Sequence, residues 1–69
     1  MITLEEIQKK LAESIKYSGM SQTEIARKIG VKQQQISSYL YGKTLPALDT
    51  LANLCQVLDL DANEILCLK

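Results

Sequence analysis

The chain has 69 residues, eight basic and eight acidic side chains, two cysteines and no histidine. A structural zinc site normally takes four cysteine or histidine ligands, so this composition excludes one. No window approaches the ~18 consecutive apolar residues of a membrane span, and no signal for export is present. We therefore expect one cytoplasmic domain spanning residues 1–69, without metal, cofactor or membrane contact, whose thiols stay reduced.

Charge is distributed unevenly along this chain of zero net charge. Residues 1–45 carry seven basic groups against four acidic ones, and residues 46–69 carry four acidic groups against Lys69 alone. The two parts are therefore +3 and −3, and no acidic residue lies between Ile25 and Leu48. Such a stretch is typical of a surface that faces a polyanion, although chance clustering in a short chain gives the same pattern.

Capping signals place most of the predicted helix starts. A Thr, Ser or Asp precedes a Glu by three positions at three places, which is the spacing of a capping box, and an apolar residue precedes each cap. These pairs are Thr3 and Glu6, Ser21 and Glu24, and Asp61 and Glu64. A fourth start has Gln35 at the same spacing but Lys32 at the cap. Lysine has no acceptor, so we expect this start to be weaker by ~1 kcal/mol than one with Ser or Thr.

The predicted stops are Gly19, Gly30 and Gly42, because glycine adopts the left-handed conformation that ends a helix. Pro46 introduces one start without a box, for which either Thr44 or Ala47 is the cap. No run alternates with the period of a strand. The sequence therefore predicts an all-α fold, a compact bundle of five short helices. They span residues 4–18, 22–29, 33–41, 48–58 and 62–68.

The second and third predicted helices are joined by a tight turn, Gly30-Val31-Lys32. Such a turn sets two helices at a steep angle, in which the second can enter a DNA major groove. On the third helix, Ile36, Tyr39 and Leu40 fall on one side. The opposite side consists of Gln34, Ser38 and Tyr41, and Gln33 and Ser37 flank it. Glutamine can pair with adenine through two hydrogen bonds and serine can meet several base edges; a merely solvated polar face is the alternative.

An ordered set of residues resembles the lambda-repressor-like (XRE, Cro/C1-type) helix-turn-helix family. The set comprises Ser21-Gln22, Glu24, Ala26, Gly30-Val31, Ile36-Ser37, Gly42-Lys43, Pro46, Leu48 and Asn63-Glu64-Ile65-Leu66. With the first helix included, the resemblance covers essentially the whole chain. It implies a five-helix bundle that binds double-stranded DNA sequence-specifically, commonly as a two-fold dimer on a near-palindromic operator.

The resemblance also implies roles by position. Gln22 matches a phosphate-contacting glutamine that can also brace the first side chain of the recognition helix. The base-reading positions are matched by Gln33, Gln34, Ser37 and Ser38. The phosphate-contacting positions are matched by Lys32, Lys43 and the backbone around Gly42. For Tyr41, a phosphate contact and a plain surface position are equally compatible with the sequence.

The chain departs from the family pattern at two places. Lys32 stands where many members have Ser or Thr, and a lysine there can meet a phosphate. Ile15 and Leu40 stand where members often have a partly buried Arg–Glu pair. We expect these two side chains to touch as an apolar pair, an exchange that can be neutral or stabilising because no charge is desolvated.

The remaining features favour a regulator over an enzyme, because no histidine, phosphate loop or nucleophile beside a base is present. We interpret Cys55 and Cys67 as small apolar residues in preference to a redox switch. The leucine-rich end predicts a dimer surface that includes Leu60, Leu66 and Leu68, with internal packing as the alternative.

We therefore predict a bacterial or phage transcriptional repressor that binds an operator as a homodimer. The alternative is an antitoxin or adaptor whose main partner is a protein.

Overall fold

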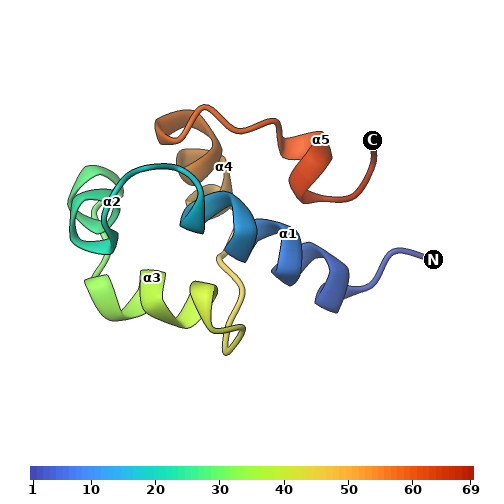
Figure 1. Ribbon diagram of the computed structural model, residues 1–69, viewed down its shortest axis with the longest axis horizontal. Helices are drawn as coiled ribbons and strands as arrows, with labels where there is room; N and C mark the ends of the chain where they lie inside the picture. The colour runs from blue at the N-terminus through green and yellow to red at the C-terminus, as the bar shows by residue number, and fades with distance from the viewer.

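Local sequence signals indicate where the helices of this chain begin. The computed structural model describes all 69 residues and contains five helices and no strand. They are α1 (Leu4–Lys16), α2 (Gln22–Ile29), α3 (Gln33–Leu40), α4 (Leu48–Val57) and α5 (Ala62–Ile65) (Figure 1). All five begin at the predicted residue, which confirms the all-α fold class and the five-helix order.

Only one of the three predicted capping boxes is complete. The Thr3 hydroxyl accepts the Glu6 N–H (3.2 Å) while the Glu6 carboxylate accepts the Thr3 N–H (3.4 Å). The Ser21 hydroxyl accepts the Glu24 N–H, but the Glu24 carboxylate does not accept the Ser21 N–H. The prediction of a box at Asp61 was wrong, because Asp61 accepts from Asn63 instead of Glu64. The cap of α4 is Ala47, which has no side-chain acceptor.

Four helices end earlier than predicted. α1 ends at Lys16 and not at residue 18, α3 at Leu40 and not at 41, α4 at Val57 and not at 58, and α5 at Ile65 and not at 68. Asp59 (φ 54°) and Cys67 (φ 61°) adopt the left-handed conformation after α4 and α5. The N–H groups of Leu60 and Leu68 then bond back to the carbonyls of Cys55 and Asn63, each at 2.8 Å. These stops escaped prediction because no glycine marks them.

A single apolar cluster holds the five helices together, and each helix contributes to it. The buried side chains are Leu11, Ile15, Ile25, Ala26, Ile36, Tyr39, Leu54, Cys55 and Ile65. Eight half-buried apolar residues, among them Leu40 and Leu60, pack around this cluster. No polar or charged side chain is buried. The cluster therefore depends on apolar packing alone.

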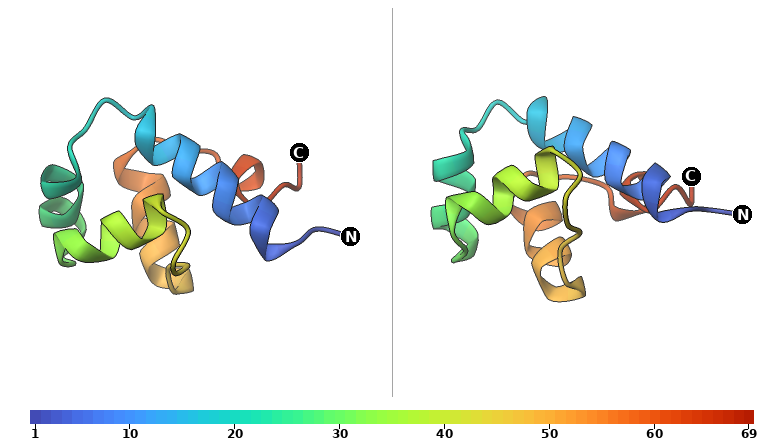
Figure 2. Two further views of the ribbon diagram at one scale, coloured as in Figure 1. Left: turned by 60° about the horizontal axis from the view of Figure 1, so that its bottom comes forward. Right: turned by 90° about the horizontal axis from the view of Figure 1, so that it is seen from below.

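The arrangement leaves α3 uncovered on one side. α1 packs against both α3 and α5, and α2 packs against α3 and α4. Figures 1 and 2 show α3 along one face of the molecule with no other helix outside it. The two chain ends lie together at another end of the molecule in every view (Figures 1 and 2).

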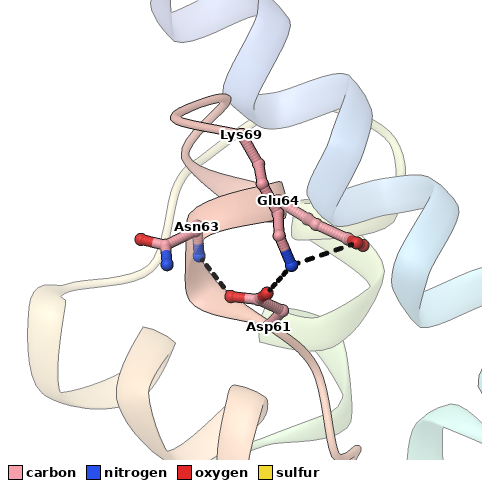
Figure 3. A network of polar contacts seen from close by, with 4 residues as sticks. All are labelled: Asp61, Asn63, Glu64 and Lys69. Carbon is pink, nitrogen blue, oxygen red and sulfur yellow. Dashed lines mark hydrogen bonds and ion pairs between the residues drawn. The ribbon is translucent and has the colours of Figure 1, made fainter.

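A polar network closes the C-terminal end of the chain (Figure 3). The Lys69 ammonium lies 2.5 Å from one Asp61 carboxylate oxygen and 4.0 Å from the Glu64 carboxylate. The other Asp61 oxygen accepts the Asn63 N–H at 2.9 Å and caps α5. The hydrogen bond from Lys69, followed by that from Asn63, lowers the pKa of Asp61 below its ordinary value of 3.8.

The Asp61 network predicts an acid-dependent loss of stability. A carboxyl whose pKa is lowered in the folded chain stabilises the fold above its ordinary pKa, and this contribution disappears as the pH falls through the lowered value. Asn caps a helix as well as Asp does but cannot titrate. We therefore expect wild type to melt above Asp61→Asn near pH 6, with the difference in Tm vanishing near pH 2. Thermal melts of both proteins followed by circular dichroism measure it; a difference independent of pH would contradict it.

The position of Leu40 supports the predicted apolar replacement of an ion pair. Ile15 is 2% exposed in the core, and Leu40 packs half-buried against the same cluster. Leu40→Glu removes apolar contacts and places a carboxylate beside them without a cation, so we expect a loss of ~2–4 kcal/mol. Tyr41→Glu adds the same charge to the neighbouring side chain, which is 74% exposed, and should cost less than ~0.5 kcal/mol. Urea unfolding compares the two; equal stability of Leu40→Glu and wild type would reject the pairing.

Candidate nucleic-acid interface

The turn between α2 and α3 is set by Gly30, whose φ of 77° ends α2 in the left-handed conformation. The N–H groups of Gly30 and Val31 both bond to the Ala26 carbonyl, at 2.9 and 3.0 Å. This closes α2 tightly, and α3 begins at Gln33, three residues after Gly30. The two helices then pack against each other, as in a helix-turn-helix unit.

The buried side of α3 fixes the orientation of its polar side. Ile36 is 0% exposed and Tyr39 is 5% exposed, so both point into the core. Burial raises the pKa of the Tyr39 phenol, with a smaller contribution from the nearby Asp49 carboxylate. Tyr39 therefore stays protonated at neutral pH and serves the core, as predicted from the helical period.

The predicted base-reading residues lie on the opposite side of α3. Gln33 and Gln34 are exposed, and Ser37 and Ser38 are half-buried beside them. The Gln33 amide N–H donates to the Gln22 amide oxygen of α2 at 3.2 Å. Gln22 therefore braces the first side chain of the recognition helix, which restricts the rotamers of Gln33 before any ligand is present.

Gln35, the third glutamine of α3, bonds to the backbone at the start of its own helix. The Gln35 side-chain oxygen accepts the Lys32 N–H at 3.0 Å and thereby forms the return half of a capping box. Lys32 gives no side-chain bond to the start of α3. Its ammonium is exposed and free, next to backbone N–H groups at the helix N-terminus that lack a cap. An anion placed there would meet both the lysine charge and these N–H groups.

The end of α3 presents a second set of groups to solvent. Gly42 (φ 74°) follows the helix, and the Lys43 N–H bonds back to the Ser38 carbonyl at 2.9 Å. Tyr41, Gly42 and Lys43 are all exposed. Lysines thus lie at both ends of α3, where the two phosphate backbones that border a major groove would run.

The basic side chains of the interface are unpaired. The two ion pairs of the chain both involve Lys69, far from α3 in the sequence. Lys32, Lys43, Arg27 and Lys28 are exposed and have no carboxylate within 4.0 Å. Their charges remain available to displace the counterions of a polyanion, which is the source of salt-dependent affinity for DNA.

Sequence reasoning missed a polar groove that runs beside the recognition helix. It is lined by Gln34, Gln35, Ser38, Tyr39, Thr44, Leu45, Ala47 and Thr50. Thr44 and Thr50 reach it because the loop after α3 folds back to the start of α4. Only the tertiary path of that loop brings these hydroxyls near Gln34, so no local signal could identify them.

The family comparison agrees with this geometry. A family model described as helix-turn-helix, of the Cro/C1 (XRE) type, matches residues 16–65. The chain belongs to this family. No curated protein and no solved structure is significantly similar to the chain.

Membership in the Cro/C1-type helix-turn-helix family makes the chain a DNA-binding regulator, of a kind that is not typically enzymatic. The match includes α2, α3, the turn between them and α4. No helix has both the length and the apolar character that a membrane crossing requires. No three His, Cys, Asp or Glu residues are grouped as metal ligands.

Proposed function

We propose that this chain is a transcriptional repressor that binds a near-palindromic operator as a two-fold dimer. α3 enters the major groove with Gln33, Gln34 and Ser38 against base edges, and Ser37 flanks them. Gln22, Lys32, Tyr41, Gly42 and Lys43 contact the phosphates on either side. Bound at a promoter, such a dimer blocks polymerase without further contacts. The observation that carries the proposal is the uncovered polar side of α3, braced at Gln33 by Gln22.

Charge and side-chain chemistry support this docking. The segment from Ile25 to Leu48, which includes all of α3, contains no acidic residue, so no side chain of that segment repels the phosphates. Exposed glutamines offer the paired donor and acceptor that adenine N6 and N7 require. We therefore expect adenine-containing half-sites. Selection of bound duplexes from a random library at stated salt tests this, and the winners also give the half-site spacing.

Two substitutions separate base reading from phosphate contact. Gln34→Ala should relax preference at one base pair by ~1–3 kcal/mol of discrimination. Lys43→Ala should instead weaken all duplexes alike and reduce the slope of log K against log salt by about 1. Binding titrations on selected and scrambled duplexes at several salt concentrations measure both effects. If both variants kept the wild-type selection and salt slope, this docking would be rejected.

An apolar groove supports the dimer. It is lined by Leu4, Ile7, Leu11, Leu45, Pro46, Leu48, Leu51 and Leu66. Leu4 (69% exposed) and Leu48 (85% exposed) stand at its rim as large apolar side chains in water. Of the three leucines predicted for the interface, Leu66 lines the groove and Leu68 is 64% exposed, whereas Leu60 packs against the core of its own chain.

A second copy of this chain is the occupant that the groove fits best. Leu45 and Pro46 belong to the segment that joins α3 to α4, so part of the groove is formed by the loop that follows the recognition helix. A two-fold copy docked there keeps both recognition helices on one face, as major grooves ~34 Å apart on one side of DNA require. Rim leucines of each copy can enter the groove of the other, which is the self-complementarity of an isologous interface. Zero net charge also means no net repulsion between copies.

Leu48→Lys tests the dimer surface. We expect dimerisation to weaken at least about tenfold, because a lysine charge cannot enter an apolar groove unpaired. Tyr17→Lys, which adds the same charge at a 78% exposed side chain of α1, serves as the control and should leave dimerisation unchanged. Sedimentation equilibrium measures both. A chain that is monomeric at every concentration and on DNA would favour the adaptor alternative, in which the groove receives an apolar segment of a different protein.

A further inference from the structure

The turn after the recognition helix is contacted by a side chain from α1. We propose that Gln8 is a further DNA-backbone contact, whose carboxamide donates a hydrogen bond to a phosphate oxygen beside the Gly42–Lys43 turn. The inference rests on the proposed docking of α3 in the major groove, and it adds a residue of α1 to the proposed DNA contacts. Neither the helix-turn-helix pattern nor the charge distribution assigns a role to this residue.

The contact between Gln8 and Gly42 is close. A Cβ atom placed on Gly42 would lie 3.2 Å from both Cδ and Nε2 of Gln8, and 3.5 Å from its Oε1. Nearly equal distances to three atoms of one planar group mean that the carboxamide lies face-on against the turn. Position 42 therefore needs glycine for two reasons, its positive φ and the approach of this amide.

The hydrogen-bonding groups of the Gln8 amide remain unused within the chain. No intramolecular hydrogen bond involves the Gln8 side chain. None of its polar atoms is buried without a partner, so they reach solvent. A half-buried side chain held by packing, with its donors free, is preorganised for a ligand because little rotamer entropy is lost on binding.

The position of the amide indicates the chemistry of that ligand. Gln8 lies against the turn whose next residue, Lys43, is exposed and unpaired. A phosphodiester has acceptor oxygens and no donor, so it matches both the amide N–H and the ammonium. Gln22 of α2 accepts a hydrogen bond from the first side chain of α3, and Gln8 of α1 lies against the turn that follows the last. The recognition helix thus lies between two glutamines from different helices.

Three variants test the contact on two duplexes, the selected operator and a scrambled sequence of equal length. Gln8→Ala should weaken binding to both by about 3–10-fold, the usual net size for one hydrogen bond. Its salt slope should stay unchanged, because an uncharged side chain releases no counterion. Gln8→Glu should weaken both by more than about tenfold through repulsion of the phosphate. Gln56→Glu, with the same charge change at an exposed position of α4, should change affinity by less than about threefold.

Thermal melts of the same variants exclude a purely packing role. The proposal expects Gln8→Ala to melt within about 2 °C of wild type. It is overturned if Gln8→Ala and Gln8→Glu bind as wild type does, or if Gln56→Glu loses as much affinity as Gln8→Glu. It is also overturned if the loss in Gln8→Ala follows a lowered Tm, since Gln8 would then only support the fold. A wild-type chain that binds no duplex would instead reject the proposed docking as a whole.

Discussion

The burial of one side of α3 is the constraint on which the rest of the structure depends. Eight residues make a helix that is not stable alone in water, and α3 starts without a side-chain cap. Its helical form therefore comes from Ile36 and Tyr39, which the core encloses almost completely. The same burial turns the glutamines outward and prevents rotation of the helix about its axis. Core packing and the proposed reading of DNA thus use opposite sides of one short helix.

Much of the fold was predictable because helix starts depend on residues three or four positions apart. Four starts followed from such local signals and that of α4 from Pro46, and the helical period separated Tyr39 in the core from Gln34 in solvent. The helix ends were less predictable, because Asp59 and Cys67 take the left-handed conformation that sequence reasoning reserves for glycine. A non-glycine residue accepts that strain when a returning hydrogen bond stabilises the turn, and after Asp59 the packing of Leu60 against the core adds to this.

In the candidate site, too, some residues could be predicted from local spacing and others could not. The glutamines and serines of α3 lie on one continuous helix, so their common face follows from spacing alone, and their contacts with bases remain predictions. Gln8 lies far from Gly42 in the sequence, and only the crossing of α1 over α3 brings them together. Leu60 shows the opposite error, because an apolar residue near a chain end can belong either to an interface or to the core. Here it packs against its own core, and the exposed leucines lie elsewhere.

Although the net charge is zero, the charged side chains near α3 and those near the C-terminus differ in whether they form ion pairs. The only ion pairs belong to the closing residues of the chain, whereas the lysines near α3 have no carboxylate partner. A surface of this kind attracts DNA locally while the molecule as a whole does not repel its own copies. The acidic residues of the second part lie in α4, in α5 and in the segment between them. They balance the total charge, and none of them forms an ion pair with a lysine near α3.

The common location of the two chain ends has a practical consequence. Both lie at one end of the molecule, beside α1 and α5, and neither lies across α3 (Figure 1). Leu4 is close to the N-terminus and Leu66 is close to the C-terminus, and both line the apolar groove. An affinity tag or a fused reporter at either end would leave the recognition helix accessible while crowding the groove. Untagged protein is therefore the appropriate material for measuring self-association, whereas a tagged protein suffices to measure contacts of a single α3 with DNA.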